Sequence, residues 1–156
     1  MYRQNAGIVV FNKQRQVLLC ERNDIKGAWQ FPQGGIESGE SVAEAALREL
    51  KEETSITTVK PVKSLSEPVR YTFTPQIIEK MQKRGITNVG QDIYWSLMYF
   101  CGNDAEINLQ TPEAEFASYR WDSFANACKL AAEFKKEAYI KAYEEFAPLI
   151  ADYETE

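Results

Sequence analysis

GGIESGESVAEAALRELKEETSI, running from Gly34 to Ile56, is the most informative segment of the chain. Its glycines favour a loop, and Ser41 followed three residues later by Glu44 is the pattern of a capping box, which starts a helix. We expect this helix to run to about Glu53. Apolar residues at i, i+3, i+4 and i+7 predict one buried face, made by Ala43, Ala46, Leu47 and Leu50.

The other face of the predicted helix is acidic. Glu49, Glu52 and Glu53 lie at i, i+3 and i+4, so at about 100° per residue their side chains share one face. Like charges at this spacing repel one another and destabilise a helix unless cations neutralise them, and oxygen ligands suit magnesium or manganese. Glu-rich helices are commonly only solvated surfaces, which is the alternative interpretation of this cluster taken by itself.

The wider spacing around the cluster resembles the Nudix box. That pattern reads Gly, five residues, Glu, seven residues, Arg-Glu, an aliphatic residue, any residue, Glu-Glu, any residue, Gly and an aliphatic residue. The residues that fit it are Gly34, Glu40, Arg48, Glu49, Leu50, Glu52, Glu53 and Ile56. Only the last glycine departs, because Ser55 takes its place. If the backbone there has a positive φ, serine costs on the order of 1 kcal/mol relative to glycine.

This resemblance implies an α/β fold: a Nudix α/β/α sandwich with a mixed β-sheet and a C-terminal helix, formed as a single domain by residues 1–156. It implies a hydrolase in which water attacks a phosphorus atom of a phosphoanhydride. The expected metal ligands are Glu49, Glu52 and Glu53, with Mg²⁺ as the expected cofactor and Mn²⁺ or another divalent ion as the alternative. We expect Arg48 to pair with a nearby carboxylate and orient the cluster, and Glu40 to support it.

The composition narrows the chemistry. The chain contains no histidine, which excludes Ser-His-Asp and Cys-His catalysis and every histidine metal site. A formal charge of -5 and a pI near 5.0 argue against a broad electrostatic surface for nucleic acid, so any RNA is held locally, and we expect no DNA partner. Cys20, Cys101 and Cys128 lack both zinc-site and disulfide spacing, and we expect free thiols.

The chain has no apolar stretch approaching the roughly 20 residues needed to cross a bilayer. Its opening residues, Met1 to Asn5, have no apolar segment typical of a signal peptide. We therefore expect a cytoplasmic protein with no membrane partner. With 44% hydrophobic residues, 156 residues are enough to bury the core of one domain.

The remaining elements are predicted from apolar patterns. Two β-branched and apolar runs, residues 5–11 and 16–21, predict a hairpin, and residues 91–101 and 116–121 predict two further strands. Residues 59–73 contain two prolines and predict one or two irregular strands, and residues 76–84 fit either a short helix or a basic loop. From about residue 124 to 150 we expect one C-terminal helix, buried through Ala127, Leu130, Ala131, Phe134, Ala138, Ala142 and Phe146.

The resemblance extends outside the box, over nearly the whole chain, to the bacterial RNA pyrophosphohydrolase family, which overlaps with dinucleoside polyphosphate hydrolases. The matching segments are Tyr2-Arg3-x-Asn5-x-Gly7-Ile8-Val9, WQFPQGG from Trp29, GNDAEINL from Gly102, and Glu115-Phe116 with Arg120-Trp121. The match is weakest between about residues 60 and 88. The implied activity removes pyrophosphate from 5′-triphosphorylated RNA, leaves a 5′ monophosphate and thereby initiates mRNA decay.

The same resemblance implies roles for residues outside the helix. Glu115 corresponds to a downstream carboxylate that binds metal or acts as general base, and Glu113 is its rival. With Glu52 and Glu53, Glu115 completes the predicted catalytic group. Arg3 corresponds to an arginine that contacts the triphosphate, which suits the forked donors of a guanidinium. Phe134 and Lys135 correspond to a pair that stacks on an RNA base and contacts phosphate, although the helical spacing of Phe134 equally favours core packing.

Two other functions remain open on the sequence. A diadenosine tetra- or pentaphosphate hydrolase would share the fold, the metals and most of the site. A nucleotide- or RNA-binding module that kept the fold and lost catalysis is the reading from a different class, and the survival of Glu49, Glu52, Glu53 and Glu115 argues against it. The sequence predicts neither the oligomeric state nor the base preference at the RNA end.

Overall fold

Two long parallel strands form the centre of the sheet in the computed structural model, which describes residues 1–155. Strand β1 (Tyr2–Phe11) pairs with β7 (Gly90–Phe100) along its full length. The antiparallel partners are β2 (Val17–Arg22) and β4 (Gln33–Gly35) on β1, and β5 (Val59–Ser64) and β6 (Val69–Thr72) on β7. β2 in turn pairs with β3 (Trp29–Gln30) and β8 (Phe116–Asp122). The mixed sheet is confirmed.

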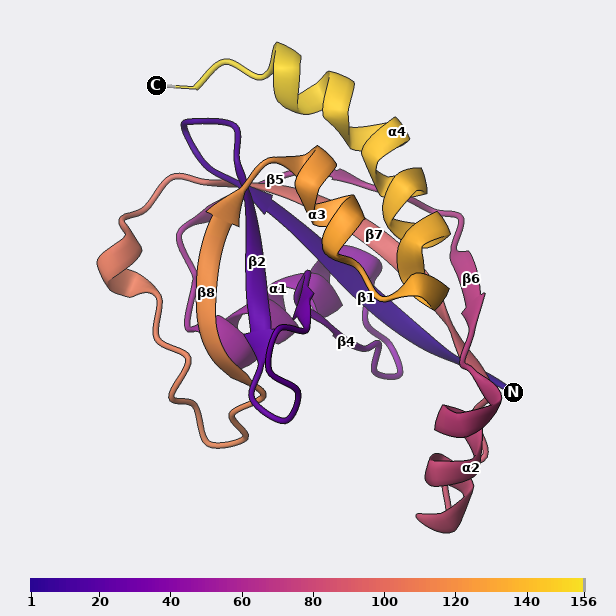
Figure 1. Cartoon of the computed structure of the whole chain (residues 1–156). Helices are drawn as coiled ribbons and strands as arrows, with labels where there is room; N and C mark the ends of the chain where they lie inside the picture. The colour runs from indigo at the N-terminus through magenta and orange to yellow at the C-terminus, as the bar shows by residue number, and fades with distance from the viewer. Residues whose placement is uncertain (156) are drawn as a thin grey trace.

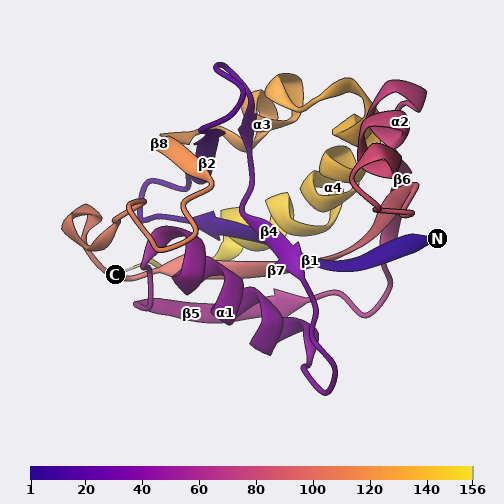
Figure 2. The same cartoon turned by 90° about the horizontal axis from the view of Figure 1, so that it is seen from below.

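Helices cover both faces of this sheet (Figures 1 and 2). Helix α1 (Val42–Thr54) lies on one face, and α3 (Phe124–Leu130) and α4 (Lys136–Asp152) lie on the other. Because successive strand residues face opposite sides, Ile8 and Val10 pack in the core under α1, whereas Val9 and Phe11 pack in the core under α4. The expected α/β/α sandwich is therefore present.

The buried face of α1 differs from the predicted stripe. Ala46 and Leu50 are buried as expected, but Ala45 is buried in place of Ala43, and Leu47 remains 37% exposed. The inner face continues through Glu53, which is only 6% exposed. The helix is therefore rotated relative to the predicted one, and its acidic face is turned partly toward the protein interior.

The C-terminal segment is two helices and not the single one predicted. The backbone leaves the helical conformation at Ala131 (φ -59°, ψ 146°) and Ala132 (φ -55°, ψ 143°), between α3 and a short 3₁₀ turn, Glu133–Lys135. Neither residue is a glycine or proline, so the sequence carries no local signal for this break. Its consequence is that Phe134 and Lys135 precede α4 rather than lying within a continuous helix.

Residues 76–84 were expected to form either a short helix or a basic loop. The structure shows a helix, α2 (Pro75–Lys83). The side chain of Thr74 caps its start by accepting a hydrogen bond from the N–H of Ile77 (3.3 Å), and Pro75 occupies its first turn. The helix stands out from the end of the sheet beside β6 (Figure 1), and none of its residues is buried. No helix within residues 1–155 is long and apolar enough to cross a membrane.

Candidate functional site

The start of α1 is fixed by local hydrogen bonds. The Ser41 hydroxyl accepts from the N–H of Glu44 (3.1 Å), and the Glu44 carboxylate accepts from the N–H of Ser41 (2.9 Å), which confirms the capping box. At the other end Ser55 has φ 68°, and its N–H donates to Lys51 O. The positive φ anticipated from the family pattern is thus adopted by serine.

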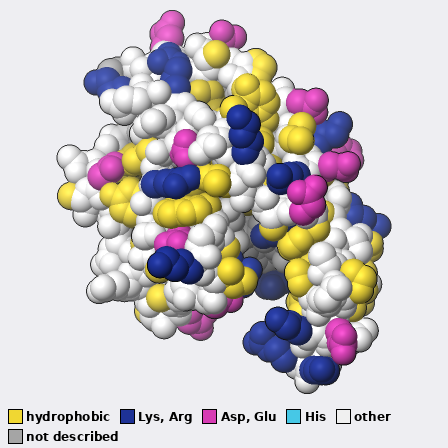
Figure 3. All heavy atoms as spheres, in the orientation of Figure 1, with side chains coloured by type: hydrophobic (Ala, Val, Ile, Leu, Met, Phe, Trp, Pro, Cys, Tyr) yellow, Lys and Arg dark blue, Asp and Glu magenta, His cyan; other side chains and the backbone are white. Residues whose placement is uncertain are grey.

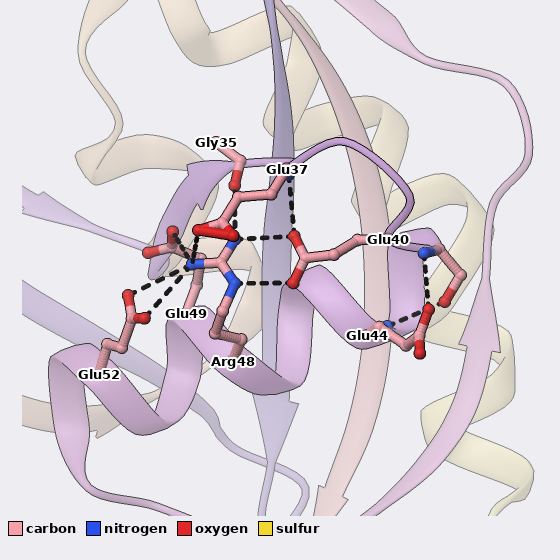
Figure 4. Close-up of polar contacts among 8 residues, drawn as sticks. Gly35, Glu37, Glu40, Glu44, Arg48, Glu49 and Glu52 are labelled. Carbon is pink, nitrogen blue, oxygen red and sulfur yellow. Dashed lines mark hydrogen bonds and ion pairs between the residues drawn. The ribbon is translucent and has the colours of Figure 1, made fainter.

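Arg48 binds the acidic residues of α1 to the preceding loop (Figure 4). Its guanidinium forms a two-pronged ion pair with Glu40 (2.7 and 2.9 Å), donates to Gly35 O (2.8 Å), and contacts Glu49 (2.8 Å). Glu52 lies farther away, at 3.3 Å. The hydrogen bonds from Arg48 are the main cause that lowers the pKa of Glu40 to about 2. The expected pairing of Arg48 with nearby carboxylates is confirmed, and Glu40 is one of its partners.

The glycines of β4 leave room for two charged side chains. A Cβ on Gly34 would come within 2.0 Å of Glu49 Cδ, and a Cβ on Gly35 would come within 2.6 Å of Arg3 Nη2. Real Cβ contacts do not approach this closely, so the carboxylate of Glu49 and the guanidinium of Arg3 both lie directly against the backbone of this strand.

Glu53 is the most perturbed carboxyl group of the site. Burial is the main cause that raises its pKa to about 10, and the charges of Glu115, Glu49 and Glu52 add to the effect. Within residues 1–155 its Oε2 atom is buried and has no hydrogen-bond partner. Burying a carboxylate without a partner is costly, and a strongly perturbed pKa in a cleft marks a candidate functional site.

The structure distinguishes the two downstream acids. The charge of Glu115 is among the main causes that raise the pKa of both Glu53 and Glu49, and Glu113 is not among them. Asn23 fixes this loop, because its backbone N–H donates to Glu115 O (2.9 Å) and its side chain donates to Ala114 O (2.7 Å). Glu115 is therefore the downstream carboxylate that adjoins the helix cluster.

The donor set fits a hard divalent cation. Burial also raises the pKa of Glu49, although Arg48 opposes it, so ionising Glu49 and Glu53 together is costly without added positive charge. Carboxylate oxygens are the ligands such ions prefer. Within the described part of the chain no three acidic side chains already converge on one point as metal ligands. A bound ion would have to draw them together.

These carboxylates line a cleft of about 800 Å³. Helix α2 contributes residues to the same cleft, and Figure 3 shows the hollow between this helix and the body of the protein with basic side chains near it. The charged residues that line the cleft are Arg3, Arg22, Asp24, Glu49, Glu52, Glu53, Lys80, Arg84, Glu113, Glu115 and Lys135. Acidic and basic groups thus share one continuous space.

All residues predicted to contact substrate lie on this cleft. Arg3 comes from β1, and Phe134 and Lys135 come from the 3₁₀ turn before α4. The ring of Phe134 packs against Tyr71 (5.6 Å between centroids) and Phe73 (6.0 Å), so it both closes the core and forms a wall of the cleft.

Lys135 is unusual among the basic residues because it is only 9% exposed. Its Nζ lies 5.9 Å from the ring centroids of both Tyr71 and Phe134. Burial, followed by the nearby charge of Arg22, lowers the pKa of Lys135 to about 8. At neutral pH the ammonium group therefore remains mostly charged between the rings of Tyr71 and Phe134.

Several cleft residues were not identified from the sequence. Arg22 ends β2 and forms an ion pair with Asp24 (2.6 Å), and Gln33 donates to Gln91 (2.9 Å) on the cleft floor beside Tyr71. These residues come from separate strands, so no local spacing connects them. Cys20, Cys101 and Cys128 are free, as expected.

Comparison with known proteins gives consistent matches. The profile of the NUDIX domain matches residues 1–145. The chain is 38% identical over 150 residues to an RNA pyrophosphohydrolase of Wolbachia pipientis subsp. Culex pipiens, covering 96% of this chain and 91% of that protein. It is also 38% identical over 150 residues to Nudix hydrolase 26, chloroplastic, of Arabidopsis thaliana, covering 94% and 69%. A solved structure of the E. coli dihydroneopterin triphosphate pyrophosphohydrolase has a TM-score of 0.70 at 19% identity, covering 92% of this chain and 97% of that one, which shows a shared fold.

Proposed function

Because the chain belongs to the NUDIX family, we propose that it is a hydrolase that removes pyrophosphate from 5′-triphosphorylated RNA and leaves a 5′ monophosphate. One observation carries the proposal: a single cleft joins the carboxylates around Glu53 to basic and aromatic groups suited to phosphate and to a base. The relative from Wolbachia bears the name of this activity and matches almost the whole chain.

NUDIX hydrolases generally use divalent metal ions, and we assign Mg²⁺, or alternatively Mn²⁺, to Glu49, Glu52, Glu53 and Glu115. The orphaned Oε2 of Glu53 supports this assignment, as do the raised pKa values of Glu49 and Glu53, to which the neighbouring carboxylates contribute. When bound, such ions offset phosphate charge and lower the pKa of an attacking water. Arg48 contributes by holding Glu49 and Glu40 in fixed positions.

The carboxylates also handle the proton of the reaction. Water adds its oxygen to the phosphorus that stays on the RNA, the bond to the leaving pyrophosphate breaks, and one proton of the water passes to a carboxylate base. Glu115 and Glu53 are the candidates for this base, with Glu52 beside them. Glu113 is less well supported, since the main charges that raise the pKa of Glu53 are those of Glu115, Glu49 and Glu52.

The substrate would be held by groups on the other walls. The forked donors of Arg3, lying against Gly35, suit an oxygen pair of the triphosphate. The exposed part of the Phe134 ring offers a surface for stacking a base, and Lys135 offers a positive charge beside it. These contacts would recognise the triphosphate and the stacked base of any RNA end. They would not select a particular base, because none of them is a base-specific hydrogen bond.

The proposal is tested by incubating the purified protein and magnesium with a short 5′-triphosphorylated RNA and analysing both products. We expect a 5′-monophosphorylated RNA and pyrophosphate, and we expect Glu53→Gln to abolish both. An RNA left intact by the wild type, while diadenosine tetraphosphate is consumed, would make the protein a dinucleoside polyphosphate hydrolase. Tight RNA binding without any turnover would instead identify a non-catalytic binding module.

A further inference from the structure

One face of α2 lines the cleft that also contains the carboxylates of α1. The residues of this helix segment that line the cleft are Ile77, Lys80, Met81 and Arg84. They lie at i, i+3, i+4 and i+7, which is the spacing of a single helical face. Lys80 and Arg84 are thus neighbours on this face, one turn apart, with Ile77 and Met81 beside them.

Core packing does not account for this helix. None of the residues of α2 is buried, and it joins the body through Thr74 at one end and the turn at Gly85 (φ 78°) at the other. A helix that adds so little to the core has its main effect on the cleft, because it extends one wall beyond the edge of the sheet (Figures 1 and 3).

The basic residues of α2 and Arg84, which directly follows the helix, differ in their ionic partners. Lys83 lies outside the cleft and pairs with Glu79 at 3.6 Å. Within residues 1–155, Lys80 and Arg84 form no ion pair, although both are exposed. Basic residues in a last turn also stabilise a helix through its dipole, but that effect would be shared by Lys83 and would not depend on the cleft.

We propose that Lys80 and Arg84 bind phosphodiester groups of the RNA downstream of its 5′ end. The inference rests on the proposed function. Arg3 and the metal site account for the triphosphate, and Phe134 with Lys135 accounts for a nearby base and phosphate, so the α2 wall remains for later phosphates. An RNA chain possesses such phosphates, whereas a dinucleoside polyphosphate has none beyond its bridging chain. α2 therefore favours a polynucleotide over a small nucleotide.

The test compares Lys80→Glu and Arg84→Glu with the matched control Lys83→Glu, which changes the same charge on the same helix outside the cleft. KM and kcat are measured with 5′-triphosphorylated RNAs of two, four and eight nucleotides. For the cleft variants we expect the rise in KM over wild type to grow with RNA length, reaching about tenfold on the longest RNA. The control should follow the wild type at every length.

Salt dependence and folding provide independent readouts. For the double variant Lys80→Gln/Arg84→Gln, the slope of log KM against log salt should fall by about 1.4, as expected for two lost contacts to a single strand. Circular dichroism and the Tm of each variant show whether α2 and the fold remain intact. Lys80→Arg keeps the positive charge and should therefore keep the KM of the wild type.

The outcomes separate the two proposals. If the wild type cleaves triphosphorylated RNA but Lys80→Glu and Arg84→Glu behave like Lys83→Glu at all lengths, the role of α2 is wrong and the proposed function stands. An equal loss at every length also contradicts it, because the two residues would then act on the triphosphate. If the wild type does not cleave RNA at all, both the proposed function and the inference fail.

Discussion

The carboxyl group of Glu49 lies against the backbone of Gly34, so close that a Cβ on Gly34 would come within 2.0 Å of Glu49 Cδ. Glu49 cannot simply move aside, because Arg48 holds its carboxylate at 2.8 Å and the side chain is only 14% exposed. The glycine is therefore needed for the position of a candidate metal ligand.

Gly34→Ala should lower kcat by at least about tenfold, since it displaces Glu49 from Arg48 and from the metal site. Gly35→Ala is the matched control. There the nearest atom belongs to the end of the long exposed side chain of Arg3, which can shift, so we expect mainly a higher KM for triphosphorylated RNA. Steady-state kinetics distinguish the two effects, and equal losses of kcat in both variants would contradict this account.

Glu53 should make the metal-free protein less stable as the pH rises. Its pKa is raised from the ordinary value of 4.5 to about 10, so between these values the folded protein keeps a proton that the unfolded chain has lost. The free energy of unfolding therefore falls from about pH 4.5 toward pH 10. Glu53→Gln should remove this dependence in EDTA and, at about pH 8, raise stability by at least about 1 kcal/mol, or roughly 2–4 °C in Tm. Glu145→Gln, an exposed glutamate of α4, is the control and should show no gain.

Magnesium should offset the destabilisation caused by the buried carboxyl group of Glu53. Because a cation that binds only the folded state stabilises it by mass action, millimolar magnesium should raise the Tm of the wild type. The rise should be much smaller in Glu53→Gln, which lacks one candidate ligand. Thermal unfolding of both proteins with and without magnesium tests this, and an equal rise in both would place the bound ion elsewhere.

Arg48→Lys should lower kcat by about 10- to 100-fold with little change in KM. A lysine keeps the charge, but a single ammonium group cannot make the two-pronged contact with Glu40 while also donating to Gly35 O and Glu49. Glu40→Gln, which loses one partner only, should have a smaller effect on kcat. A fully active Arg48→Lys protein would show that the fixed geometry of this ion-pair network is unimportant.

Ser55→Gly should stabilise the protein by up to about 1 kcal/mol, because glycine adopts a positive φ without a steric cost. The gain is reduced by loss of the hydrogen bond from the Ser55 hydroxyl to Asn108 O (2.9 Å). Ser55→Ala is the informative control, since it loses that bond and keeps the unfavourable φ, and it should be less stable than the wild type. Urea unfolding of the three proteins gives the order directly, and a less stable glycine variant would contradict the argument.

The elements that were predicted correctly from the sequence are those fixed by local interactions. The capping box at Ser41 and the positive φ at Ser55 depend on neighbouring residues, and the structure bears them out. The hairpin of residues 5–11 and 16–21 and the strands at 91–101 and 116–121 are also present, although β1 begins earlier, at Tyr2, and the short strands β3 and β4 were not predicted. The failures have non-local causes. The sheet determines which side of α1 is buried, so Ala45 and Glu53 face inward although periodicity favoured Ala43 and Leu47. The break before Phe134 likewise has no glycine or proline to mark it.

In the candidate site, too, the residues that share a local spacing were predicted and those brought together by the fold were not. The spacing within α1 identifies Glu49, Glu52 and Glu53, and resemblance adds Glu115, Arg3, Phe134 and Lys135, all of which line one cleft. Arg22, Gln33 and the inner face of α2 reach that cleft only through strand pairing and chain crossings. A single sequence contains no spacing that connects such distant segments, so their contribution requires the fold.

The substrate of this cleft is decided by measuring kcat/KM side by side, with magnesium, for a short 5′-triphosphorylated RNA and for diadenosine tetraphosphate. We expect a higher value for the RNA, a 5′ monophosphate as its product, and loss of both activities in Glu53→Gln. A clearly higher value for the dinucleotide would contradict RNA as the main substrate, and undiminished activity of Glu53→Gln would contradict the assigned catalytic centre.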